Sequence, residues 1–188
     1  NAGLKGTLKE MRTLLSSPTT DFGCISLKRS IDYLSKQVKG VEIRIKQIIS
    51  ADESMSTNYE LLSSLKGVGL VVACQLIYHT GNFTRFASWR AFSSYCGTAP
   101  FEHRSGTSIH RRKQCHYLGD RKMKSLLSMA SVSAIQHDSE LRLYYKRKLA
   151  EGKDKMLAIN NVRNKLIARA FAVIKRGTPY VVLQQHAA

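Results

Sequence analysis

A seam of aliphatic residues in the first third of the chain constrains its fold more than any other feature. The seam steps by four and three residues in alternation, through Leu27, Ile31, Leu34, Val38, Val41, Ile45 and Ile48. An average spacing of about 3.5 residues keeps one apolar stripe along a helix and is typical of helices that wind around each other. The seam therefore predicts a long helix that packs along a second helix.

The partner of this long helix has two candidates. The same stepping recurs at Leu4, Leu8, Met11 and Leu15, and the turn-forming stretch SSPTTDFG separates this run from the long helix. The partner is therefore either the short helix folded back or a second protomer. Gly40 interrupts the seam, so an ordinary amphipathic helix docked on a core remains the alternative. We assign residues 1–57 to a coiled-coil connector.

Beyond residue 58 the apolar spacing becomes that of short, compactly packed helices. We expect helices at 58–65, 69–79, 88–96, 120–136, 138–151 and 154–176. No stretch shows the sustained two-residue alternation of a half-buried strand, so we predict an all-α fold, with residues 58–188 as one C-terminal domain. The polar segment 97–118 is expected to be a long loop, and loops of that length in compact domains are usually functional.

The charge of the chain indicates the nature of its partner. Its 30 Lys and Arg residues outnumber its 13 Asp and Glu residues and give a net charge of +17, which attracts a polyanion. DNA is the expected partner, and an anionic membrane surface is the alternative. The sequence has no run of about 18 apolar residues and no positive-then-apolar leader, so we expect a cytoplasmic protein that does not insert into a membrane.

The cysteines and histidines do not form a recognisable metal motif. The four cysteines include no C-x-x-C pair, which favours reduced thiols over disulfides. A group of potential ligands lies close together in the sequence, at Cys96, His103, His110, Cys115 and His116. Their spacings lack the tight turn that pre-organises two zinc ligands. We therefore predict that this chain holds no metal ion.

The stretch LLSSLKGVGLVVACQLI, residues 61–77, has the pattern of a helix-hairpin-helix. Gly67 and Gly69 on either side of Val68 allow a tight turn with positive φ. The free amides at the start of the second helix then face outward, with the positive end of the helix dipole behind them. Such a turn binds a DNA phosphate without reading sequence. An ordinary helix hairpin is the alternative, since Gly-x-Gly is common.

A second basic region extends from the polar segment into the helix that follows it. Between residues 103 and 124 Asp120 is the single acid, and the cations are Arg104, Arg111, Arg112, Lys113, Arg121, Lys122 and Lys124. Asp120 is predicted to cap the helix, so three of these cations lie near its start, where the helix dipole disfavours positive charge. A bound DNA phosphate would relieve this conflict, and a solvated charged face is the alternative. The later helices add a weaker basic pattern that includes Arg163 and Arg169.

The scarcity of carboxylates narrows the chemistry. Glu102 is the only acidic residue between residues 61 and 119, so this region cannot supply the acidic ligands of a two-metal nuclease. Covalent catalysis remains: Ser105 could attack a phosphodiester, with His103 or His110 as the proton acceptor and the neighbouring arginines neutralising charge. A serine that merely shapes a turn is the alternative on the residues alone.

The order of these motifs resembles that of a known family. The stretches LKGVGLVVACQLIYHTGNFTRFASWRAFSSYCGTAPFEHRSG, YLGDRKMKSLLSMASVSA and RNKLIARAFAVIKRGTPY together resemble the C-terminal transposase domain of the insertion-sequence family related to pilin-gene invertases and to bridge-RNA-guided recombinases. The similarity runs from about residue 60 to residue 181. In that family the serine of the SG pair after the Gly-x-x-Pro stretch is the nucleophile that links covalently to a DNA end. The resemblance implies this role for Ser105.

The resemblance also implies a larger protein. The family carries an N-terminal RuvC-like domain whose acidic residues bind Mg²⁺, and nothing in residues 1–57 resembles that domain. We therefore expect this chain to be a C-terminal piece of a recombinase that binds DNA but is inactive alone, with no cofactor of its own and Mg²⁺ in the missing domain. The family implies a homodimer or tetramer and allows a guide RNA as a further partner. The alternative is a non-catalytic helix-hairpin-helix module for DNA binding and oligomerisation.

Overall fold

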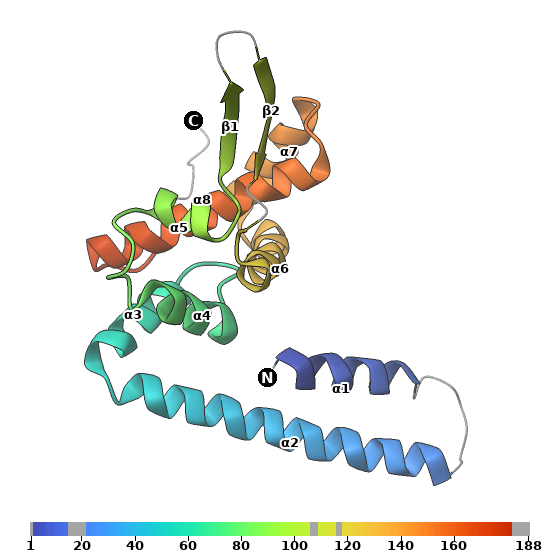
Figure 1. The fold of residues 1–188 in the computed structure, drawn as a ribbon. Coiled ribbons are helices and arrows are strands. Elements are labelled where there is room, and N and C mark those ends of the chain that lie inside the picture. The colour runs from blue at the N-terminus through green and yellow to red at the C-terminus, as the bar shows by residue number, and fades with distance from the viewer. Residues whose placement is uncertain (1, 15–21, 106–108, 116–117, 182–188) are drawn as a thin grey trace, which may run out of the picture. The chain divides into compact units, whose positions relative to one another are not determined.

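The chain forms two units that divide between Glu53 and Ser54, whereas the sequence suggests a boundary at residue 57. The computed structural model describes residues 2–14, 22–105, 109–115 and 118–181. Helices account for most of the described residues in both units (Figure 1). The first unit holds the seam, and the second holds the Gly-x-Gly turn and the serine segment.

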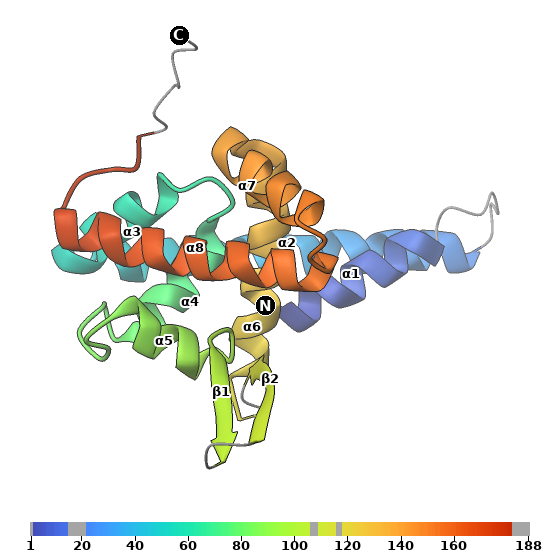
Figure 2. The same cartoon turned by 90° about the horizontal axis from the view of Figure 1, so that it is seen from above.

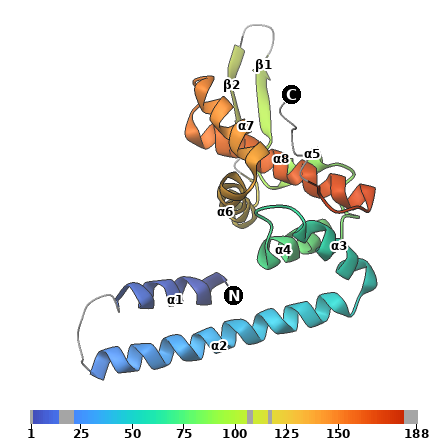
Figure 3. The same ribbon diagram turned by 180° about the vertical axis from the view of Figure 1, so that it is seen from behind.

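The first unit is a pair of helices, α1 (Ala2–Leu14) and α2 (Phe22–Ser50), which lie side by side (Figures 1 and 3). Ile31 and Val38 of the seam are buried, and Met11 of α1 packs against them. The short helix folded back is therefore a partner of the seam, as one of the two alternatives predicted.

The short helix covers only part of the seam. At about 1.5 Å per residue, the 13 residues of α1 span less than half the length of the 29 residues of α2. Val41 and Ile48, near the C-terminal end of the seam, remain 41% and 55% exposed. An apolar stripe of α2 is thus left without a cover from α1.

The body of the second unit is helical. Its helices are α3 (Glu53–Ser63), α4 (Leu70–Thr80), α5 (Trp89–Tyr95), α6 (Arg121–His137), α7 (Ser139–Ala150) and α8 (Lys155–Arg176). α8 is the central element and packs on α5, α6 and α7 (Figure 2). Leu62, Phe92, Leu127 and Ile167 are among the core residues between them. The sequence predicts all of these helices, and the one large difference is that α3 begins at Glu53 instead of residue 58. No helix in the described part of the chain is both long enough and apolar enough to cross a membrane.

Aspartates determine where three of these helices begin. The Asp120 carboxylate accepts a hydrogen bond from the Met123 N–H at 2.8 Å, and Asp138 accepts one from the Leu141 N–H at 3.0 Å. Asp154 caps α8 in the same way. Such side chains satisfy amides that have no partner within the helix. The cap predicted at Asp120 is therefore confirmed.

The segment 97–118 is not the loop that the sequence predicts. Strands β1 (Pro100–Ser105) and β2 (Ile109–Cys115) pair as a two-stranded antiparallel sheet, with Arg104 opposite His110. The hairpin projects from the helices of its unit (Figures 1 and 2). Hydrophobic alternation marks a strand with one face on a core, and a projecting hairpin needs none because strand pairing satisfies its backbone groups. The all-α fold class is confirmed, and the expectation of a loop at 97–118 is wrong, because this segment contains the hairpin.

The connection between α3 and α4 depends on one glycine. Gly67 has a φ of +88°, and a Cβ there would lie 2.5 Å from the Ala130 carbonyl oxygen and 2.8 Å from the Ala134 Cβ, both on α6. Gly69 has a φ of −95°, and a Cβ there would meet nothing within 4 Å. Of these two residues, Gly67 is therefore the one whose position favours glycine.

We expect Gly67→Ala to lower the free energy of unfolding by about 2 kcal/mol, because its methyl group meets backbone atoms and its φ is strained. Gly69→Ala is the matched control, with an expected change below about 0.5 kcal/mol. Thermal unfolding followed by circular dichroism measures both variants. Equal Tm values for the two would contradict the close packing of Gly67 against α6.

Candidate nucleic-acid site

Ser105 is the last residue of β1 and is paired across the hairpin. The same ladder places Arg104 opposite His110 and His103 opposite Arg111. The backbone therefore brings the predicted nucleophile, both predicted proton acceptors and two predicted cations within two register positions of each other. Polar residues that the sequence predicts to form a loop are thus paired across an antiparallel hairpin.

The two remaining hairpin cations, Arg112 and Lys113, also lie on β2. The side chains of residues 101–117 lie outside the described part of the structure. The roles that the sequence gives to Ser105 and to the hairpin cations therefore stay predictions.

The strand carries Ser105 away from the helical body. At about 3.3 Å per residue, the six residues of β1 place Ser105 roughly 17 Å beyond Pro100. The hairpin makes its main contacts within itself, between β1 and β2. The serine backbone thus lies at the far end of a projecting strand and not within a pocket of the helical body.

A polar cluster lies at the root of the hairpin. The Tyr95 hydroxyl of α5 lies 3.0 Å from Nδ1 of His79 in α4 and donates to Asp120 Oδ2 at the long distance of 3.4 Å. Burial, followed by the charge of Asp120, raises the pKa of the Tyr95 hydroxyl, so it stays protonated at neutral pH. The cluster ties α4, α5 and the start of α6 together, and it lies too far from Ser105 to take its proton.

Neither the Cys96 thiol nor a metal cluster provides a reactive centre among the described side chains. Cys96 is fully buried, and burial raises the pKa of its thiol to about 12, so it is not a nucleophile at neutral pH. Among the described side chains, no group of three or more His, Cys, Asp or Glu residues could hold a metal ion. The Cys/His group considered in the sequence falls mostly on side chains outside the described part.

The start of α6 presents positive charge at the root of the hairpin. Arg121 and Lys122 are exposed, and Lys124 is half-buried. The carboxylate of Asp120 is occupied as the helix cap. Within the described part of the chain no ion pair joins these three cations to a carboxylate. The conflict between these cations and the helix dipole, inferred from the sequence, is therefore present in the structure.

The Gly-x-Gly turn exposes one of its three residues. The Val68 side chain is buried in the core, and its N–H donates to the Leu65 carbonyl oxygen at 3.1 Å. Gly67 packs against α6. Gly69 is exposed and is the N-cap of α4, with no side chain to cap the helix. Any anion contact at this turn therefore falls to Gly69 and the first amides of α4.

Two cations of the later helices do not belong to a basic surface. Arg163 is only 4% exposed, and its Nη1 donates to Asn160 Oδ1 at 3.1 Å. Arg169 pairs with Asp138 at 2.8 Å and with Glu140 at 2.6 Å. The weak basic pattern inferred from the sequence is therefore wrong at these two positions, because both guanidinium groups hold the fold together.

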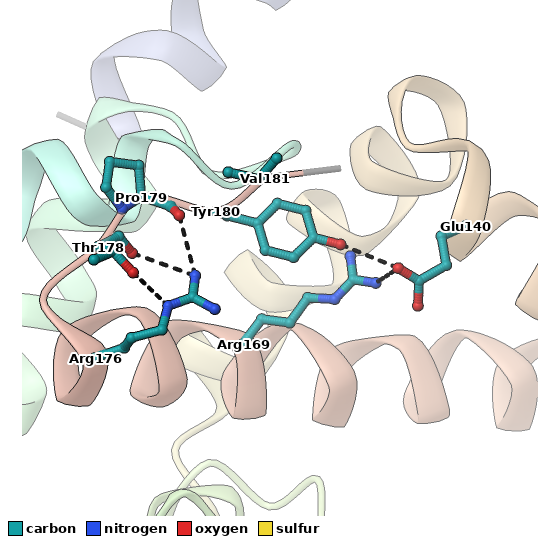
Figure 4. Close-up of a pocket in the computed structure, with 7 residues that line it drawn as sticks. All are labelled: Glu140, Arg169, Arg176, Thr178, Pro179, Tyr180 and Val181. Carbon is teal, nitrogen blue, oxygen red and sulfur yellow. Dashed lines mark hydrogen bonds and ion pairs between the residues drawn. The ribbon is translucent and has the colours of Figure 1, made fainter. Parts of the chain in front are cut away.

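The pocket beside Arg169 is occupied by structural contacts (Figure 4). It measures about 610 Å³ and lies between α7, α8 and the segment that follows α8. The Arg169 guanidinium group lies 4.7 Å from the centre of the Tyr180 ring, and the Tyr180 hydroxyl donates to Glu140 at 3.1 Å. Burial raises the pKa of Tyr180 to about 12, which keeps this donor protonated. These contacts hold the segment after α8 against α7 and α8.

Two asparagines of α8 receive no role from the sequence. Asn160 and Asn164 both donate to the Thr98 carbonyl oxygen at the root of β1. The available signal is weak: two carboxamides one helical turn apart, on a helix that also carries Asn161 and several cations. Sequence reasoning misses them because nothing in the chain links them to a residue more than 60 positions earlier.

Comparison with known proteins gives these elements a family context. Residues 59–146 match the family model described as Transposase IS116/IS110/IS902 family. The chain is 27% identical over 152 residues to the "Pilin gene-inverting protein" of Moraxella bovis, covering 80% of this chain and 47% of that protein. It is 30% identical over 162 residues to the "Insertion element IS110 uncharacterized 43.6 kDa protein" of Streptomyces coelicolor, covering 86% of this chain and 39% of that protein.

The chain thus spans about half the length of the Moraxella relative and less of the Streptomyces one. The matched region contains the α3–α4 turn, the hairpin, α6 and most of α7. Residues 59–146 are therefore similar to a domain of the IS116/IS110/IS902 transposase family.

Proposed function

We propose that this chain is part of a DNA transposase or recombinase, in which it holds DNA and supplies Ser105 as the nucleophile of strand cleavage. One observation carries the proposal: Ser105 ends a strand of a projecting, cation-rich hairpin within the region that matches a transposase-family model. A projecting hairpin can reach a DNA backbone that a serine inside the helical body could not. The name of the pilin gene-inverting relatives agrees with a recombination reaction.

In the proposed step, Oγ of Ser105 attacks the phosphorus of a DNA phosphodiester. A serine–phosphate ester forms, the bond from phosphorus to one deoxyribose oxygen breaks, and that oxygen leaves as a hydroxyl after taking up a proton. The serine proton passes to an acceptor, for which His103 and His110 are the candidates on the hairpin. Arg104 and Arg111 would neutralise the charge that develops on the phosphate oxygens.

The Mg²⁺ that the family resemblance implies finds no fitting ligand set around the serine. Carboxylate oxygens are its preferred ligands, and Glu102 is the only carboxylate between residues 61 and 119. We therefore assign the acidic ligands to a separate RuvC-like domain and derive no step through a metal in this chain. A guide RNA and a homodimeric or tetrameric assembly belong to the same proposal for the whole protein.

Replacing Ser105 tests the chemistry. In the full-length protein, we expect Ser105→Ala to reduce the covalent protein–DNA adduct at least about a hundredfold, since no other hydroxyl takes over the attack. The adduct is measured by denaturing gel electrophoresis after incubation with a plasmid that carries the element's own ends. The Kd for DNA is expected to change less than about twofold, because a neutral hydroxyl contributes little to phosphate binding.

Ser108→Ala is the matched control, and we expect it to leave adduct formation intact. Undiminished adduct in Ser105→Ala would remove Ser105 from the mechanism. That outcome would favour the second candidate, a non-catalytic module for DNA binding and oligomerisation.

A charge at Gly69 tests the turn before α4. Gly69→Asp supplies the missing N-cap, so the fold keeps or slightly gains stability, while the carboxylate repels a phosphate at the same amides. We expect the Kd for a short fluorescein-labelled DNA duplex to rise about three- to tenfold. Gly69→Asn, which caps without charge, is the matched control. An equal Kd for Gly69→Asp and Gly69→Asn in fluorescence anisotropy would place DNA away from this turn.

The uncovered stripe of α2 favours an assembly role for the first unit. Val41 and Ile48 continue the seam beyond the part that α1 covers, and both are exposed. A second copy of α2 would bury this stripe and would be the second protomer that the sequence offers as the other partner of the seam. This role is compatible with either candidate function.

We expect the double change Val41→Lys and Ile48→Lys to shift the protein toward monomers, raising the dissociation constant of the oligomer at least about tenfold. Ile43→Lys is the matched control, because Ile43 is 57% exposed but lies off the seam. Light scattering coupled to size-exclusion chromatography measures the mass. A protein without the changes that stays monomeric at high concentration would contradict an α2 interface.

A further inference from the structure

Two asparagines of α8 hold the backbone at the root of β1. The Nδ2 groups of Asn160 and Asn164 donate to one acceptor, the Thr98 carbonyl oxygen, at 2.9 and 3.1 Å. The Thr98 hydroxyl lies 3.0 Å from Asn164 Oδ1 and 3.1 Å from the Ser93 carbonyl oxygen. Thr98 is fully buried. Hydrogen bonds away from water are stronger, and leaving one unmade there costs more than it does at the surface.

The asparagines are themselves held in place. Arg163 donates to Asn160 Oδ1, and Asn164 Nδ2 also lies 3.2 Å from the Asn160 carbonyl oxygen. The next turn of α8 buries Leu166 and Ile167 in the core. The network therefore attaches the root of β1 to α8, the central helix of the unit.

The other strand is fastened at its root as well. Gly119, which follows β2, approaches Gly97 so closely that a Cβ on Gly119 would lie 2.4 Å from the Gly97 Cα. The Asp120 N–H then donates to the Tyr95 carbonyl oxygen at 3.0 Å, while the Asp120 carboxylate caps α6. Thr98, before β1, and Gly119, after β2, thus both have their backbone held by contacts with the helical body.

Because the hairpin projects, a small rotation at its root moves its far end by a larger distance. Ser105 lies roughly 20 Å beyond Thr98 at the rise of a strand. A tilt of about 10° at the root would displace Ser105 by roughly 3 Å, and a misplacement of about 1 Å already costs an enzyme on the order of a hundredfold in rate. An apolar contact would also stabilise the root, but hydrogen bonds have preferred directions and so fix its orientation.

We propose that Asn160 and Asn164 are positioning residues, which act through the Thr98 carbonyl group to aim the Ser105 hairpin at the scissile DNA phosphate. The inference rests on the proposed function of Ser105. It gives α8 control over a reaction that takes place about 20 Å away.

The first test measures the reaction in the full-length protein. We expect Asn164→Ala to slow formation of the serine–DNA adduct at least about tenfold, and Thr98→Val about threefold, because both loosen the root. Thr98→Ser keeps the hydroxyl and is expected to restore the rate to within about twofold of the unchanged protein. The Kd for a short DNA duplex is expected to change less than about twofold in all of them, since the basic contacts are retained.

Asn161→Ala is the matched control, a neighbouring carboxamide on the same helix that makes no hydrogen bond to Thr98 in the described part of the chain. We expect it to react at the unchanged rate. If Asn164→Ala does not fold, Thr98→Val carries the test, because it removes one hydroxyl and keeps the shape of the side chain.

The second test measures position and does not depend on catalysis. Nitroxide labels on ketone-bearing residues placed at Arg112 of β2 and Lys146 of α7 report the distance from hairpin to body by pulsed electron paramagnetic resonance. We expect this distance distribution to broaden in Asn164→Ala and not in Asn161→Ala. An unchanged distribution, or equal reaction rates in the two variants, overturns the inference. Adduct formation that survives Ser105→Ala overturns the proposed function instead, and the distance measurement still decides whether the asparagines fix the root.

Discussion

The close approach of Gly97 and Gly119 is the constraint on which the second unit depends. A side chain at Gly119 would collide with backbone atoms of Gly97, so the end of α5 and the start of α6 can meet because Gly119 lacks one. Their meeting allows the Asp120 N–H to reach the Tyr95 carbonyl oxygen, and α8 closes the root from its other side through Thr98. The hairpin between these two glycines therefore projects from the core. Its charged residues avoid the large desolvation cost that burial would impose.

The few acidic residues are used to hold helices together, which leaves an excess of cations for a polyanion. Asp120 caps α6, and Asp138 both caps α7 and pairs with Arg169. A cap contributes about 1 kcal/mol, so these carboxylates stabilise the fold more than surface ion pairs would. The chain has 30 Lys and Arg residues and 13 Asp and Glu residues, so more than half of the cations cannot form a one-to-one ion pair with an acid. The net charge is therefore a property of the surface, and DNA is the partner that it suits.

The helices could be predicted from the sequence because their signals are local: apolar spacing, and an aspartate such as Asp120 one residue before α6 begins. The hairpin could not, because its strands cover no core and so show no alternation. The sequence predicts Val68 within an anion-binding turn, yet its side chain is buried and its N–H is occupied, since the turn packs on α6. The contacts of Asn164 with Thr98 join residues 66 positions apart, and no local pattern reports such a pair.

A serine at the end of a projecting strand is not activated in the way of a serine within a preassembled triad. The titratable groups at the root, His79 and Asp120, are separated from Ser105 by roughly the length of β1, about 17 Å. If Ser105 is the nucleophile, as proposed, its proton acceptor comes from the hairpin itself or from a group that DNA binding brings near. Under the proposed mechanism, the site is complete only with DNA in place. In this mechanism a serine hydroxyl reacts only once a phosphate, cations and a proton acceptor surround it. The distance of Ser105 from the helical body then keeps the serine unreactive in the protein without DNA.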